Sequence, residues 1–176
     1  MKLNVHQIEE SAKQLTYEEP TEPLNARLVH GGVCDFEFPA KATVRVDYYR
    51  AGLELFFHGK IEGTVVGHCA RCLEDYTFSL ATNFDVVLIP KPDLREHVEL
   101  TADELDLSYY SGDQVDLTPL VDEQIILALP TRPLCGENCK GLCPSCGANL
   151  NQATCNCTVS TGNPRLAVLR ELKIGH

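Results

Sequence analysis

The chain of 176 residues lacks the features that mark membrane proteins and the common classes of enzyme. No apolar run approaches the ~18 residues that a membrane-spanning helix needs. The first residues carry Glu9, Glu10, Glu18 and Glu19 and lack the basic and then apolar layout of a signal peptide. There is no glycine-rich phosphate loop, no Gly-x-Ser-x-Gly elbow and no His-Glu-x-x-His pair. We therefore expect a cytoplasmic protein that is not an enzyme and takes no small-molecule substrate.

An excess of basic residues is also missing. The formal net charge is −10, which argues against a broad basic surface for nucleic acid. Residues 131–176 hold five basic and two acidic residues, a balance of +3, whereas residues 1–130 hold ten and twenty-three, a balance of −13. The acidic part could attract basic proteins or could serve only solubility, and charge alone leaves both interpretations open.

Cysteine, in contrast, is abundant. The chain has nine cysteines, and in a reducing cytosol such a number indicates metal binding rather than disulfides. The segment Cys143-Pro-Ser-Cys146-Gly147 has the spacing of a zinc knuckle, and four thiolates around one Zn²⁺ make a closed, structural site. We predict one structural Zn²⁺, held by four of six cysteines, with Cys139, Cys143, Cys146 and Cys157 preferred. The six candidates are Cys135, Cys139, Cys143, Cys146, Cys155 and Cys157.

A second thiol pair, Cys69 and Cys72, lies in Cys-Ala-Arg-Cys. Three interpretations compete for it. A redox pair normally begins a helix, but the flanking residues here predict a β turn. The pair could share a second metal with spare C-terminal cysteines. The interpretation we favour is a structural turn with buried thiols and an exposed Arg71.

Alternating apolar and polar residues between positions 25 and 89 predict β-strands, with Ala51-Gly52 as a hairpin turn and a bend near Asn83 in the last strand. Residues 1–25 are ambiguous between strand and helix. A helix is predicted from Thr118, as its cap, to the residue before Pro130. The expected fold class is α+β. An antiparallel sheet, open or curled into a partial barrel, is packed by one main helix and followed by a cysteine-rich zinc module and a short final helix over 164–173. We expect a core domain over 1–130 and the module over 131–176.

Four stretches of the chain carry a family resemblance, namely residues 69–74, 116–120 with 123–130, 133–151, and 163–169. In this order they resemble the YceD-like family, also called the large ribosomal RNA subunit accumulation proteins. The ordered series makes the resemblance specific, whereas the first 65 residues share only a general β character. The cysteine cluster is similar to that of a metal-bearing branch, which implies that the metal stabilises this branch and is not the core function.

The resemblance implies a non-enzymatic role in accumulation or processing of 23S ribosomal RNA, and so in biogenesis of the large ribosomal subunit. Its partners would be ribosomal RNA or ribosomal and assembly proteins of that subunit. No association with a membrane is expected. Arg71, Lys140 and Arg165 are candidate contacts to phosphates, because arginine suits bidentate phosphate binding. The alternative function is a thiol-redox or zinc-responsive regulator that uses Cys69, Cys72 and the spare cysteines.

Overall fold

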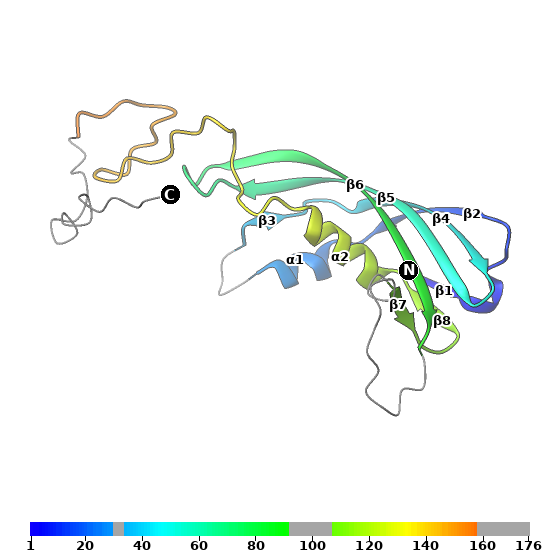
Figure 1. The fold of residues 1–176 in the computed structure, drawn as a ribbon. Helices are drawn as coiled ribbons and strands as arrows, with labels where there is room; N and C mark the ends of the chain where they lie inside the picture. Colours follow the sequence, from blue (N-terminus) through cyan, green and yellow to red (C-terminus); the bar gives the residue numbers. More distant parts are fainter. Residues whose placement is uncertain (30–33, 92–106, 158–176) are drawn as a thin grey trace, which may run out of the picture.

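The chain folds as an α+β structure in which a long, curved sheet carries helices on one side (Figure 1). This computed structural model describes residues 1–29, 34–91 and 107–157. The elements are β1 (Lys2–Asn4), the 3-10 helix η1 (Val5–Gln7), β2 (Lys13–Glu19), α1 (Glu22–Leu28), β3 (Phe36–Glu37), β4 (Ala42–Ala51), β5 (Glu54–His68), β6 (Asp75–Pro90), β7 (Leu107–Tyr110), β8 (Gln114–Asp116) and α2 (Thr118–Ala128).

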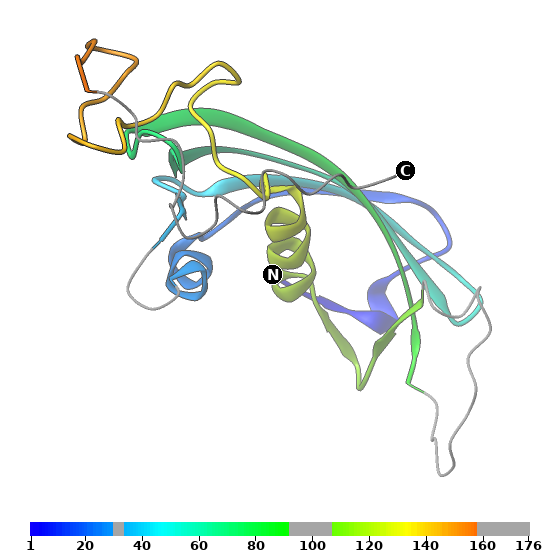
Figure 2. The ribbon, with the colours of Figure 1, turned by 60° about the vertical axis from the view of Figure 1, so that its left-hand side comes forward.

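The three longest strands, β4, β5 and β6, form consecutive antiparallel hairpins. The predicted hairpin is confirmed, but its turn lies one residue further on, at Gly52-Leu53, because Ala51 still pairs with Glu54. Gly52 adopts a φ of +63°, which glycine reaches without steric cost. Asn83 stays paired with Lys60 in an unbroken register. The expected local bend is therefore absent, and the whole of β6 curves instead (Figure 2). As a result the β5–β6 hairpin extends well beyond the helices.

The main sheet is open in the part of the chain that the structure describes. Its strands follow the order β2-β4-β5-β6-β7, while β3 pairs with β5, and β1 and β8 form a separate two-stranded ribbon. The α+β fold with a mainly antiparallel sheet is confirmed, but β7 pairs parallel to β6 and the partial barrel is not confirmed. Residues 13–19 form an edge strand, because Leu15 and Tyr17 alternate with polar residues. Pro23 lies in the first turn of the helix α1, which begins at Glu22.

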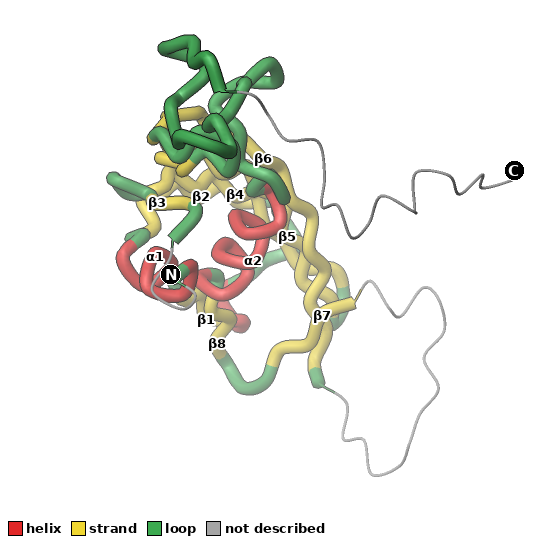
Figure 3. Tube along the Cα trace, turned by 90° about the vertical axis from the view of Figure 1, so that its left-hand side faces the viewer, coloured by secondary structure: helices red, strands yellow, loops and turns green. Residues whose placement is uncertain are grey.

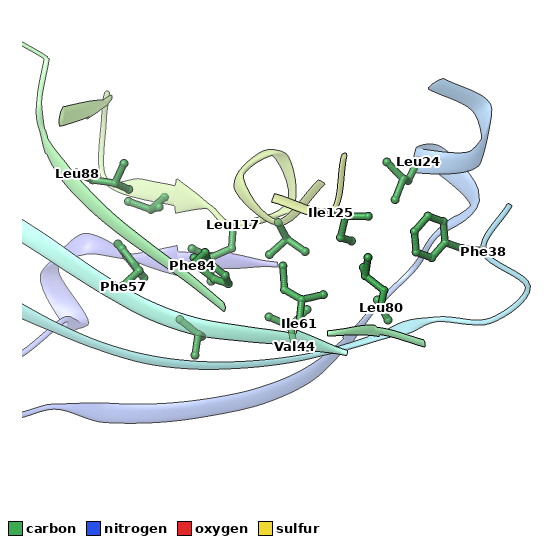
Figure 4. Close-up of a cluster of buried hydrophobic side chains, with 14 of the residues drawn as sticks. Leu24, Phe38, Val44, Phe57, Ile61, Leu80, Phe84, Leu88, Leu117 and Ile125 are labelled. Atoms are coloured by element: carbon green, nitrogen blue, oxygen red, sulfur yellow. The ribbon is translucent and has the colours of Figure 1, made fainter. Parts of the chain in front are cut away.

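The hydrophobic core lies between the concave face of the sheet and the two helices (Figure 4). One hydrophobic cluster contains Phe57 and Ile61 of β5, Leu80 of β6, Leu24 of α1 and Ile125 of α2, and each of these side chains is at most 4% exposed. Burial of each such side chain contributes about 1.5–3 kcal/mol. Along β4 and β5, buried side chains on one face of the sheet alternate with mostly polar side chains on the opposite face.

The helix α2 confirms the main helix predicted from the sequence, but Thr118 is not its N-cap. Leu117 occupies the cap position, and Thr118 is already helical. The Thr118 amide instead donates to Oδ1 of Asp116 at 3.1 Å, so the acceptor comes from the preceding strand. Asp122, which is 4% exposed, accepts a hydrogen bond from Arg27 and ties α2 to α1. None of the described helices is both long and apolar enough to cross a membrane.

The cysteine-rich segment 135–157 lies beside the turn that joins β5 to β6 (Figures 1 and 3). Within it, the described backbone forms turns and one isolated bridge, Leu142 to Asn149. The predicted final helix over 164–173 lies outside the described residues. The division into domains 1–130 and 131–176 stays a prediction. The two parts meet closely, because cysteines from both contribute to one cluster.

Candidate metal centres

Eight cysteines gather into two groups of four. The first group, which we call the hairpin centre, contains Cys69, Cys72, Cys135 and Cys139. The second, which we call the module centre, contains Cys143, Cys146, Cys155 and Cys157. Within each group the four sulfur atoms lie within 4.8 Å of one another. The ninth cysteine, Cys34, lies apart from both and donates to the carbonyl of Phe36.

The hairpin centre begins in the turn between β5 and β6. The amide of Leu73 donates to the carbonyl of Cys69 at 2.8 Å, and the amide of Cys69 donates to the carbonyl of Glu74 at 3.0 Å. Leu73 adopts a φ of +61°, in the left-handed region that leucine rarely occupies. These bonds close a tight turn that places the sulfurs of Cys69 and Cys72 on the same side.

The module centre begins in a turn with the same hydrogen bonds. The amide of Gly147 donates to the carbonyl of Cys143 at 2.9 Å, and the amide of Cys143 donates to the carbonyl of Ala148 at 2.8 Å. Gly147 has a φ of +73°. The two Cys-x-x-Cys turns therefore share one design, and Leu73 stands where the second turn has glycine. The likeness gives Cys69 and Cys72 the same geometry as the Cys143–Cys146 turn, which is compatible with metal binding.

Sulfur spacing in the hairpin centre fits a tetrahedral ion. Four sulfurs at about 2.3 Å from a Zn²⁺ ion are about 3.8 Å from one another. The sulfurs of Cys69 and Cys139 are 3.8 Å apart, and those of Cys72 and Cys135 are 3.7 Å apart. The residues present therefore fit a four-coordinate metal, with no oxygen or nitrogen ligand required.

The segment 133–142 is fastened to the hairpin turn by backbone contacts as well as by the cysteines. The amide of Ala70 donates to the carbonyl of Pro133 at 2.9 Å, and the amide of Leu142 donates to that of Arg71 at 3.1 Å. At Gly141, which has a φ of +73°, a side chain would meet the Arg71 carbonyl oxygen at 3.0 Å. Glycine is therefore required there both for its conformation and for the close approach.

In each group, hydrogen bonds from backbone amides favour the thiolate form of one cysteine, which is the form that binds a metal ion. Burial raises the pKa of the Cys69 thiol, but the backbone amides of Cys135, Cys72 and Arg71 outweigh it and lower that pKa from 9.0 to about 6. The pKa of Cys143 falls to about 6 through the amides at the matching positions in its own turn, those of Cys146 and Ser145.

In each group another cysteine resists ionisation. The pKa of Cys135 rises to about 12, mainly through its contact with the Cys139 sulfur. The pKa of Cys157 rises to about 12, mainly through its contact with the Cys146 sulfur. Four thiolates cannot share so small a volume without a cation, so metal binding would release protons from these groups.

Comparison with known proteins decides the family. The model of the family described as "Large ribosomal RNA subunit accumulation protein YceD" matches residues 57–173, which include both centres. This chain belongs to the YceD family. No solved structure matches it.

Curated YceD relatives come from plants and bacteria. The chain is 25% identical to the "Large ribosomal RNA subunit accumulation protein YCED homolog 1, chloroplastic" of Arabidopsis thaliana, over 71% of this chain and 46% of that protein. The maize protein of the same name is 28% identical over 68% of this chain and 49% of its own length. The uncharacterized Bacillus subtilis protein YlbN is 25% identical over 98% of this chain and 96% of its own length. The chain thus spans about half the length of the chloroplast relatives.

Within this YceD chain, the structure groups the cysteines differently from the expected set. Cys139 lies in the hairpin centre, whereas Cys143, Cys146 and Cys157 lie together in the module centre. The six C-terminal candidates are thus shared between two sites, and the pair at 69–72 completes the first. This grouping matches the interpretation, left open by the sequence, in which Cys69 and Cys72 share a second metal site with C-terminal cysteines.

The candidate phosphate contacts are placed unequally. Arg71 directs its guanidinium inward, where Nη1 donates to the carbonyls of Glu137 at 3.2 Å and Cys139 at 2.9 Å. Arg71 is half-buried rather than exposed as expected, because part of its hydrogen-bonding capacity fastens the hairpin centre. Lys140 is exposed, and its backbone amide donates to Asn151. Arg165 lies outside the described residues.

Proposed function

We propose that this protein supports accumulation of the large-subunit ribosomal RNA, as a non-enzymatic factor in biogenesis of the large ribosomal subunit. The observation that carries the proposal is the family match over residues 57–173. The names of the two chloroplast relatives, which cover about 70% of this chain, support the same role. In bacteria and plastids that molecule is the 23S RNA, so we expect the protein to support accumulation of 23S RNA.

We further propose that both centres hold Zn²⁺ and that its role is structural. Each group offers four thiolate ligands and no other donor, and such closed sets are typical of structural zinc. The segment 135–157 has little regular structure and few buried apolar side chains. Metal–thiolate bonds would supply the folding free energy that a core cannot supply there.

The first test measures ribosomal subunits in cells that lack this protein. We expect a lower ratio of large to small subunits in a sucrose gradient, with reduced or unprocessed 23S RNA. A normal ratio and normal RNA under several growth conditions would refute the proposed function.

Complementation separates a structural from a direct role of the metal. Cells are supplied with the wild-type chain, with Cys72→Ser, or with the control Cys34→Ser, and the protein level is measured beside the subunit ratio. A structural role predicts that Cys72→Ser lowers the protein level and the rescue together, while Cys34→Ser rescues fully. Lost rescue at an unchanged level of Cys72→Ser would contradict it.

Contact with phosphate is tested through exposed charge. The candidate residues for this contact are Lys140 and Arg165, which lie in residues 131–176, where the charge balance is +3. The double variant Lys140→Ala with Arg165→Ala should weaken binding to a 23S RNA fragment, whereas the control Arg45→Ala, an exposed residue of β4, should not. Equal binding by all three proteins would instead favour a link through basic ribosomal proteins.

A further inference from the structure

The two centres differ in their access to solvent. In the hairpin centre, Cys69 is 0%, Cys72 4% and Cys139 8% exposed, so that only Cys135 reaches the surface. The module centre has the opposite balance, because only Cys143 is buried, at 3%, while Cys146 and Cys157 are both exposed. The module centre thus has two exposed cysteines and a half-buried one, Cys155, whereas the hairpin centre has a single exposed cysteine, so a dissolved reagent has better access to the module centre.

The two centres also differ in how firmly their ligands are held. Cys69 and Cys72 follow the end of a fifteen-residue strand whose pairing with β6 continues to His68. Three backbone or guanidinium contacts from Arg71 hold the opposing segment against this turn. The module centre closes over only fifteen residues, 143–157, and its described backbone contains no strand or helix. Its outer sulfurs can approach one another without disrupting the sheet.

From this difference we propose that the module centre is an oxidation site, at which a peroxide joins Cys146 and Cys157 into a disulfide and releases the metal. The hairpin centre keeps its metal under the same conditions. The inference rests on the proposed metal at both centres and not on the ribosomal role. Both ligand sets are thiolates when metal is bound, so exposure and freedom to move decide which set reacts.

The reaction balances with peroxide as the oxidant. One exposed thiolate attacks a peroxide oxygen, the O–O bond breaks, and with one proton a sulfenic acid and water form. The other thiolate attacks the sulfenic sulfur, an S–S bond forms, and with a second proton water leaves. Two electrons pass from the sulfurs to the peroxide. Cys143 and Cys155 remain as two ligands, which are too few for a closed site, and the ion dissociates.

The same reaction is hindered in the hairpin centre. Its exposed cysteine, Cys135, has buried neighbours, and its sulfur lies 3.7 Å from that of Cys72. A disulfide needs the sulfurs at about 2.05 Å, so either the strand-anchored turn or the segment 133–142 that is hydrogen-bonded to it would have to shift. The attachment of the segment 133–142 to the hairpin should therefore survive oxidation that empties the module centre.

The experiment uses the full chain loaded with Zn²⁺. The metal content is first measured by mass spectrometry, and two ions per chain are expected. Hydrogen peroxide is then added, the released Zn²⁺ is followed with the chelating dye 4-(2-pyridylazo)resorcinol, and disulfides are located by peptide mapping. The first ion should leave about tenfold faster than the second, because reaction follows exposure. The fast phase should coincide with a Cys146–Cys157 disulfide.

The outcomes separate the two proposals. Fewer than two ions per chain at the start would overturn the metal proposal and this inference together. Two ions that leave at one rate, or a first disulfide within the hairpin centre, would overturn this inference alone. The control Cys34→Ser should release metal with wild-type kinetics, since Cys34 belongs to neither centre. A reductant added after the fast phase should restore the disulfide to thiols and, with Zn²⁺, the second bound ion.

Discussion

The matching turns at positions 69–74 and 143–148 allow a quantitative test of how the backbone sets metal affinity. Gly147 has a φ of +73°, and a Cβ atom added there would meet no atom within 4 Å. The substitution Gly147→Ala therefore adds conformational cost without any steric clash. The left-handed conformation costs an L-residue about 1–2 kcal/mol. Because the turn forms together with the metal site, this cost should appear as weaker binding at the module centre, by about five- to thirtyfold.

The assay is a competition titration, in which the protein and a chelating dye compete for Zn²⁺ and the affinity of each centre is fitted. Gly136→Ala is the matched control, because it also adds a methyl group into open space near a cysteine but at a residue without a positive φ. Its Zn²⁺ affinity should equal that of the wild-type chain. Leu73→Gly should tighten the hairpin centre, since Leu73 is 70% exposed and loses little contact. Unchanged affinity in Gly147→Ala would refute the idea that the left-handed turn governs the site.

Three further predictions concern the rest of the chain. Cys135→Ser should bind one Zn²⁺ per chain by mass spectrometry where Cys34→Ser binds two, and equal content in both would contradict the assignment of Cys135 to the hairpin centre. Ile125→Ala, at a fully buried position of α2, should lower the free energy of unfolding in urea by about 2–5 kcal/mol. The control Leu127→Ala, at 70% exposure, should change that free energy by no more than about 0.5 kcal/mol. Burial, and then the carboxylates of Glu19 and Asp116, raise the pKa of Tyr17 above 10.0. An unfolded tyrosine ionises near pH 10 while folded Tyr17 resists, so the stability from this group is present below pH 10 and falls as the pH rises further. The free energy of unfolding, measured with a chemical denaturant at several pH values, should fall less above pH 10 in Tyr17→Phe than in the wild-type chain.

Local signals predicted the central elements well. The helix α2 was predicted because Pro119 and Pro130 mark its two ends and its apolar residues recur at helical spacing. The β4–β5 hairpin was predicted because Gly52 supplies the turn between two alternating runs. The strand β2 was left ambiguous between strand and helix, because only Leu15 and Tyr17 alternate with polar residues there and its pairing with β4 is a tertiary contact.

The grouping of the cysteines was beyond local reasoning for a different cause. Sequence spacing favoured a site made wholly from residues 135–157, yet Cys72 meets Cys135 across 63 positions. The signal at the first turn was also obscured, since Leu73 replaces the glycine that normally reveals such a knuckle. Only the length of the β5–β6 hairpin, which extends its turn beyond the helices to the segment 133–142, brings the two halves together.

The separation of the two halves of the hairpin centre has a consequence for the order of events during protein synthesis. Cys69 and Cys72 emerge from the ribosome long before Cys135, which follows Cys72 by 63 positions. At 5–20 residues per second, the interval is about 3–13 s. During this interval the first pair can bind a metal ion only through two sulfurs. The final four-ligand arrangement, and with it the attachment of the C-terminal segment, must wait until nearly the whole sheet and α2 have been made.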